Sequence, residues 1–303
     1  MLSIQEIVKA LDTYGAKEVI LAAGASPAVK LKRGIEFFNH SKIKPDEVRN
    51  LLLNLKQRSK LVNKPLGNRG QFSVGIPGVG RLQVFYAIQR GSYLIAIKKV
   101  NDMPPMLREI MQNPLDRDAI LSVFHDPKGF ILIHSPSEEP AHDFIAAVLY
   151  YLSRFSKFAI FTIEDPITYV LRHEQSLILQ VEVGQDTESI AEGIKTSHFL
   201  NPDVVYVSKL KSTLDLRELL SIIERGNMVI LPVISTSLTS SMLSLERLSE
   251  DPVLFRNIIA FFLRTCFSLK EVEKGKIDIK AIHITKDLKD AIREGDYTQI
   301  LNE

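Results

Sequence analysis

The segment His134–His142 lies where an α/β protein usually holds a ligand. It contains the residues His-Ser-Pro-Ser-Glu-Glu-Pro-Ala-His and follows the apolar run Gly129–Ile133. The next residues, Asp143–Leu152, have apolar side chains at helical spacing, which predicts an amphipathic helix. A loop between a buried strand and a helix is a common phosphate site, because the N–H groups of a glycine-rich turn point at the ligand. This segment contains no glycine.

The polar residues of this segment allow two interpretations. His134, Glu138, His142 and Asp143 carry side chains that bind divalent ions, so a metal site is one hypothesis. The other is a set of solvated loop residues, which we favour because mixed polar residues at loop spacing are a weak motif. The single cysteine, Cys266, excludes an intrachain disulfide and a cysteine-cluster metal site. We predict that the chain has no metal centre.

A pair of carboxylates follows the next apolar run, Phe158–Ile163. Glu164 and Asp165 precede Pro166, so the chain is expected to turn there. Such carboxylates can take part in catalysis, or they can accept hydrogen bonds from nearby amides and cap the turn. We favour the structural role.

The elements that position these residues differ between the two halves of the chain. Beyond residue 115, the apolar runs at 129–133, 158–163, 203–207 and 228–234 alternate with amphipathic segments, which predicts a parallel sheet with helices on both faces. A closing antiparallel hairpin is expected from Phe267–Glu271 and Asp278–Ile284 around 273–276, and then a final helix.

The first hundred residues mix short strands with two helices. One helix has an apolar face that includes Ile4, Ile7 and Leu11 and ends at Gly15, and the other spans Pro45–Leu55. Strands are predicted at 18–22, 28–32, 70–74, 80–86 and 93–98, with a hairpin turn at 76–80. This half is predicted to be a small α+β domain with a largely antiparallel sheet. Paired prolines in Asn101–Pro105 indicate a hinge.

Composition excludes several classes of protein. The 303 residues carry 38 Lys and Arg against 36 Asp and Glu, a net charge of +2, which gives no support for nucleic-acid binding by bulk charge. The longest apolar stretches, such as Ile258–Leu263, fall far short of the roughly 20 residues that span a bilayer. The first residues lack the pattern of a secretory signal. We expect a cytoplasmic protein without direct membrane insertion.

Several motifs, in order along the chain, resemble those of the PilT family of secretion and twitching-motility ATPases. In the second half they are Thr162–Ile167 (Thr-Ile-Glu-Asp-Pro-Ile), Val183–Thr187 and Asn201–Val205. In the first half they are Gly15-Ala16, Ala23-Gly24, Pro77-Gly78-Val79 with Arg81, and Gln89-Arg90-Gly91. The resemblance covers the whole chain.

The resemblance implies a fold and an assembly. A PAS-like N-terminal domain is expected over 1–100, a linker over 101–114 and a RecA-like parallel-sheet domain over 115–303. Members of the family form hexameric rings that bind ATP between the two domains and a neighbouring subunit. Arg81 and Arg90 resemble family arginines near the nucleotide, although solvated strand arginines explain them equally well.

The ATP-binding loop of the family is degenerate in this chain. The family motif Gly-x-x-Gly-x-Gly-Lys-Ser/Thr cradles phosphates with its amides, pairs its lysine with the terminal phosphates and places its hydroxyl on Mg²⁺. The aligned residues here are Ser135, Glu138, Pro140, Ala141 and His142. Pro140 has no amide donor, and Ala141 has no charge. Glu138 and its neighbour Glu139 would repel phosphate, at about 4 kcal/mol for one like-charge pair 4 Å apart at an effective dielectric constant of 20.

The other motifs of the family have also changed. Ser208 and Lys209 stand where the family has Gly-Glu, so the charge at the Walker B position is reversed. Both histidines of the histidine box are replaced, by Asn227 and Ile234. Two basic positions before Asn201 align with Lys195 and Phe199. The acidic box keeps Glu164 and Asp165 as vestiges.

Joint loss of these motifs predicts a pseudo-ATPase without ATP or Mg²⁺. Its role would be structural or regulatory, in a type IV pilus or type II-related secretion machine on the inner face of the cytoplasmic membrane. The expected partners are active ATPase homologues or the inner-membrane platform protein, with a weak homo-oligomer as a further expectation. The alternatives are a divergent ATPase with residual nucleotide binding, completed by a partner subunit, and a nucleotide sensor.

Overall fold

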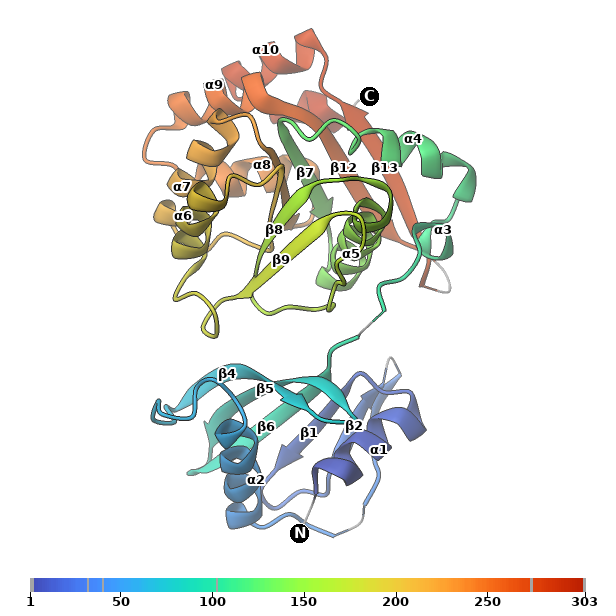
Figure 1. The fold of residues 1–303 in the computed structure, drawn as a ribbon, viewed down its shortest axis with the longest axis vertical. Coiled ribbons are helices and arrows are strands. Elements are labelled where there is room, and N and C mark those ends of the chain that lie inside the picture. The colour runs from blue at the N-terminus through green and yellow to red at the C-terminus, as the bar shows by residue number, and fades with distance from the viewer. Residues whose placement is uncertain (1–2, 32, 40, 102, 273–274, 302–303) are drawn as a thin grey trace. The chain divides into compact units, whose positions relative to one another are not determined.

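The computed structural model describes residues 3–31, 33–39, 41–101, 103–272 and 275–301. The chain divides into two compact units, Met1–Asp102 and Met103–Glu303 (Figure 1). The second unit therefore begins before the expected residue 115. Helix α3 (Leu107–Ile110) and a 3₁₀ turn (Pro114–Asp116) occupy the stretch expected to be a linker, because Leu107 and Ile110 are buried in the core of the second unit.

The first unit is an antiparallel sheet with two helices, as the sequence predicts. The strand order is β3-β2-β1-β6-β5-β4, and every pair of neighbours is antiparallel. The strands are β1 (Glu18–Ala22), β2 (Ala28–Leu31), β3 (Gly34–Phe37), β4 (Arg69–Ile76), β5 (Gly80–Gln89) and β6 (Ser92–Lys99). Helices α1 (Ile4–Tyr14) and α2 (Pro45–Gln57) contribute Ile7, Leu11, Leu52 and Leu55 to its core. Gly15 ends α1 with φ of 57°.

The second unit is built on a seven-stranded sheet with the order β13-β12-β7-β11-β10-β8-β9. Only the edge pair β12–β13 is antiparallel, and the other pairs are parallel. The strands are β7 (Phe130–Ser135), β8 (Ala159–Glu164), β9 (Leu177–Glu182), β10 (Val204–Val207), β11 (Met228–Ile234), β12 (Leu263–Glu271) and β13 (Ile277–His283). The edge strands β3 and β9 form where no strand was predicted. The tip of the expected closing turn, 273–274, lies outside the described residues.

Helices cover both faces of this sheet, because the central strands carry apolar side chains on both faces. In β7, Phe130 and Leu132 belong to one core, while Ile131 and Ile133 belong to the other. The first core is closed by α6 (Ile190–Leu200), α7 (Thr213–Glu224), α8 (Leu238–Glu246), α9 (Pro252–Phe262) and α10 (Lys286–Glu294). The second is closed by α3, α4 (Arg117–Ser122) and α5 (Glu138–Phe155).

No helix in the described part of the chain is long and apolar enough to cross a membrane.

Helix α6 approaches strand β8 closely, and a glycine makes this approach possible. A Cβ atom added to Gly193 would lie 2.7 Å from Cγ2 of Ile163, and both residues are buried. We expect Gly193→Ala to reduce the free energy of unfolding by about 1–2 kcal/mol, since overpacking outweighs the gain in helix propensity. Thermal unfolding followed by circular dichroism measures this change.

The matched control is Gly75→Ala in β4, where an added Cβ meets nothing within 4 Å. It should leave the midpoint of thermal unfolding unchanged. A Gly193→Ala protein as stable as the wild type would contradict the close packing of α6 on β8.

Candidate functional site

Parallel strands bring the candidate residues to one edge of the sheet. The carboxyl ends of β7, β11, β10 and β8 are neighbours in the strand order, and ligands of such sheets bind beyond this edge. Hydrogen bonds join adjacent ends: the Ser235 amide donates to the Ser135 carbonyl at 3.0 Å, and the Asp165 amide donates to Oγ of Ser208 at 3.0 Å. We call this the carboxyl edge.

The connection from β7 to α5 is a two-residue turn. Strand β7 ends at Ser135 and α5 begins at Glu138, so only Pro136 and Ser137 lie between them. The Ser135 hydroxyl donates to the Ser137 carbonyl at 2.7 Å, which closes the turn on itself. A phosphate loop places about five residues between its first glycine and its lysine. Here the residues from Glu138 onward are helical, and Pro136 and Ser137 form the turn before them.

This geometry corrects the expected start of the helix at Asp143. The residues aligned with the phosphate loop form the first turn of α5 instead. Glu138 and Glu139 are exposed there, and their charges complement the positive end of the helix dipole, as a phosphate does elsewhere. Pro140 is buried and supplies no N–H, and the Ala141 side chain is fully buried in the core.

Two lysines hold the carboxylate of Asp165. This carboxylate is 2% exposed; Nζ of Lys209 lies 3.5 Å from its Oδ2, and Nζ of Lys211 donates a hydrogen bond to the same oxygen. The ammonium groups thus supply, at this carboxylate, the positive charge that a divalent cation would otherwise bring. Lys209 stands at the position that aligns with the Walker B glutamate of the family. Its positive charge pairs with Asp165, which belongs to the acidic box.

The buried side chain of Glu164 joins β8 to β9 through hydrogen bonds. Its Oε1 accepts hydrogen bonds from Oγ1 of Thr162 at 2.7 Å and from Nε2 of Gln180 at 2.9 Å. Burial raises the pKa of Glu164 to about 7, the hydrogen bonds oppose this rise, and the nearby Glu182 adds to it. The carboxyl group therefore serves as a buried hydrogen-bond acceptor between strands.

The residues of the metal hypothesis bind other side chains. Nδ1 of His134 lies 3.2 Å from Oγ of both Ser235 and Ser241, and burial lowers the His134 pKa. Asp143 accepts a hydrogen bond from the Tyr169 hydroxyl at 2.5 Å. Among the residues that the structure describes, no cluster of three or more His, Cys, Asp or Glu side chains is arranged to hold a metal ion.

The other aligned positions have structural or surface roles. Nδ2 of Asn227 donates to the Pro202 carbonyl at 2.5 Å, which fixes the loop before β10. Lys195 pairs with Glu192 at 2.9 Å on α6. Phe199 is 89% exposed and Ile234 is 44% exposed.

The two candidate arginines, Arg81 and Arg90, both lie on the hairpin of β5 and β6. Arg81 begins β5, partly buried, and Arg90 is exposed in the β5–β6 turn with φ of 49°. His142 is half-buried in α5.

Sequence reasoning missed three residues that shape this edge. Lys211 and Gln180 carry no motif, and only contacts between distant segments reveal their roles. Asp215 did carry a signal, because Ser212-x-x-Asp215 is a capping-box pattern before an apolar run. Its buried carboxylate accepts hydrogen bonds from the amides of Ala191, Lys211 and Ser212, which ties α6 to α7.

Protonation of Glu164 links stability to pH. Because its folded pKa lies above its unfolded value near 4.5, the folded state holds a proton that the unfolded state releases between about pH 4.5 and 7. Stability should therefore fall as pH rises through this window, by up to about 3 kcal/mol for this group. We expect Glu164→Gln to flatten the pH profile of urea unfolding there.

The exposed Glu224 provides the control, since Glu224→Gln should leave the profile unchanged. A Glu164→Gln protein that retains the wild-type slope would show that another group dominates this window.

Comparison with known proteins relates the whole chain to pilus and secretion motors. No family model matches the chain. The type IV pilus retraction ATPase PilT of Pseudomonas aeruginosa is 22% identical over 305 residues, covering 99% of this chain and 88% of that protein. The type IV pilus ATPase PilU of the same organism is 20% identical, covering 75% of this chain and 58% of that protein.

Solved structures agree with this relation. A crystal structure of the pilus retraction motor PilT with bound ADP superposes with a TM-score of 0.84 at 26% identity, covering 100% of this chain and 89% of that one. The ATPase DotB of Legionella pneumophila, at 13% identity, shares the fold with a TM-score of 0.75 over 98% of this chain and 87% of that one. The predicted fold class, a small N-terminal domain followed by a RecA-like parallel-sheet domain, is confirmed. The chain is therefore similar, over its whole length, to type IV pilus retraction ATPases in sequence and in fold.

Proposed function

We propose that this chain is a non-catalytic PilT-like subunit that acts through protein contacts. Its role is structural or regulatory, in a type IV pilus or related secretion machine, beside active ATPase homologues or the inner-membrane platform protein. The observation that carries the proposal is the two-residue connection between β7 and α5. A chain without a phosphate cradle has lost the main source of affinity for a nucleotide.

The charges at the carboxyl edge support the same conclusion. Lys209 and Lys211 already neutralise Asp165, so a divalent cation gains little there and meets two positive charges. Glu164 is buried, and its carboxyl group is engaged with Thr162 and Gln180, so it is not free to position an attacking water. The cradle, the metal site and the base are therefore compromised together.

We expect no ATP binding at millimolar nucleotide with Mg²⁺, because the first turn of α5 has no lysine and no hydroxyl, Pro140 lacks an amide donor, and Glu138 and Glu139 repel phosphate. Isothermal titration measures this directly, with an active pilus retraction ATPase as the positive control. A micromolar dissociation constant would contradict the proposal and favour the divergent ATPase or the nucleotide sensor.

Restoring the family lysine should damage the fold and leave nucleotide binding absent. The Ala141 side chain is fully buried among Phe144, Ile145 and Ile133, so Ala141→Lys places an ammonium group in a packed core. We expect the free energy of unfolding to fall by about 3 kcal/mol or more.

Glu138→Lys is the matched control, since it adds a lysine to the same helical turn at an exposed position. It should change the unfolding midpoint much less than Ala141→Lys does. Measurable ATP turnover by the Ala141→Lys protein would mean that the loop can still form.

A further inference from the structure

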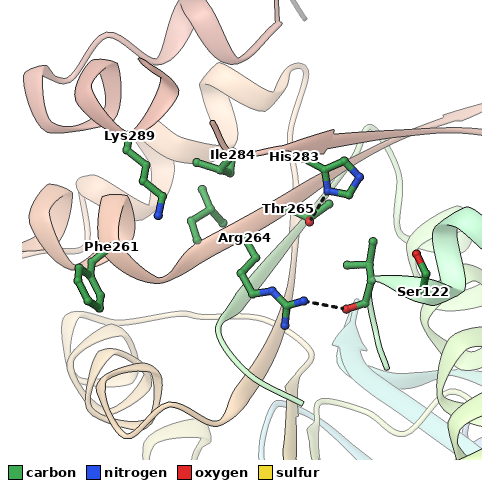
Figure 2. A pocket seen from close by; sticks show the side chains of 9 residues that line it. Ser122, Phe261, Arg264, Thr265, His283, Ile284 and Lys289 are labelled. Carbon is green, nitrogen blue, oxygen red and sulfur yellow. Dashed lines mark hydrogen bonds between the residues drawn. The ribbon is translucent and has the colours of Figure 1, made fainter. Parts of the chain in front are cut away.

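A cavity lies at the edge of the seven-stranded sheet opposite the carboxyl edge. It is a cavity of about 360 Å³ where β12 begins and β13 ends, beside α10 (Figure 2). Leu263 at the start of β12 pairs with Phe130 at the start of β7, which places the cavity at the amino edge of the parallel strands. Its lining residues are Ser122, Val123, Phe261, Leu263, Arg264, Thr265, His283, Ile284 and Lys289.

The lining of this cavity contains basic residues, of which Arg264 forms an ion pair with Asp126 outside the lining at 3.8 Å. Arg264, Lys289 and the titratable His283 line it, and no Asp or Glu is among the lining residues. Lys289 is half-buried, and within the described chain its ammonium group makes no hydrogen bond or ion pair. In Figure 2 this ammonium group points from α10 toward the cavity. A partly desolvated cation without a partner favours an anionic ligand.

The neighbouring donors indicate which anion fits. Arg264 donates to the carbonyls of Asp126, Lys128 and Val123 at 2.9, 2.5 and 3.4 Å, so its guanidinium fork is occupied. Oγ1 of Thr265 is engaged by Nδ1 of His283 at 3.3 Å. Phosphoryl groups are usually held by several free donors or a guanidinium fork, which this cavity lacks. A single carboxylate needs only the Lys289 ammonium group.

Three exposed apolar side chains lie on one face of α9, with the exposed Asn257 between Val253 and Phe261, and we call these three apolar residues the stripe. Val253, Leu254 and Phe261 are 64%, 53% and 68% exposed on the outer face of this helix, where an amphipathic helix would carry polar residues. Phe261 also lines the cavity. Between Val253 and Phe261 the helix rises about 12 Å, the length of a short peptide segment.

We propose that this cavity and stripe form a docking site for a partner protein, through a segment that carries an acidic residue beside apolar residues. The carboxylate pairs with Lys289, and the apolar side chains cover Phe261 and the stripe. A membrane surface fits less well, because Lys289 lies half-buried in a hollow and does not project from the surface. This site is independent of whether the carboxyl edge binds nucleotide.

The test uses the full chain and random 12-residue peptides displayed on phage. We expect selected peptides to be enriched in Asp or Glu next to Leu, Ile or Phe. Fluorescence polarisation of a labelled selected peptide should then give at least tenfold weaker binding to Lys289→Glu and to Phe261→Ser. Exposed residues serve as matched controls: Lys286→Glu on the same helix and Phe199→Ser on α6 should bind as the wild type does.

Other outcomes would overturn the proposal. Selected peptides without acidic residues, or equal binding by Lys289→Glu and Lys286→Glu, would remove Lys289 from recognition. Direct binding of inorganic phosphate that depends on Lys289, combined with no enriched peptide, would assign the cavity to a phosphoryl ligand instead. Binding to anionic lipid vesicles that depends on Lys289, again without peptide enrichment, would assign the surface to a membrane. Circular dichroism confirms that each variant is folded before binding is compared.

Discussion

The burial of strand β7 is the constraint on which the second unit depends. All six of its residues are buried, and it pairs with β11 on one side and β12 on the other. Its alternate side chains supply both hydrophobic cores, so neither its register nor its direction can change without loss of packing. The chemistry of the domain is therefore decided by the few residues that follow the strand, among which Glu138 and Glu139 are exposed.

The carboxyl edge satisfies its own charges and hydrogen bonds. Glu138 and Glu139 complement the dipole of α5, and Lys209 and Lys211 neutralise Asp165. A bound phosphate could otherwise complement the helix dipole, and a bound metal ion could otherwise neutralise Asp165. An edge that is already neutral gives a ligand little to gain in electrostatic energy, since binding would first have to displace these internal partners.

Sequence patterns predicted the frame of the molecule because burial leaves a strong periodic signal. The central strands and the change of sheet type between the halves followed from runs such as Gly129–Ile133. The edge strands β3 and β9 were missed because they are short and partly exposed, with mixed patterns. The start of α5 was also missed, since residues 134–142 lie where a ligand loop is expected, whereas proline is tolerated in the first turn of a helix. The pairing of Lys211 with Asp165 joins residues 46 positions apart, and no local pattern encodes it.

The loss of the lysine at position 141 and the gain of a helical turn are physically linked. In a phosphate loop the lysine must leave the core to reach the phosphates, so the chain has to remain open ahead of it. Alanine does not require an open chain ahead of it. Its methyl group packs in the core, and the preceding residues join the helix. Alanine is also the strongest helix former, and Pro140 fits the first turn because its missing N–H has no helical partner there. The residues at this loop thus stabilise the fold, which explains how the packing persists without the lysine and glycines of a phosphate loop.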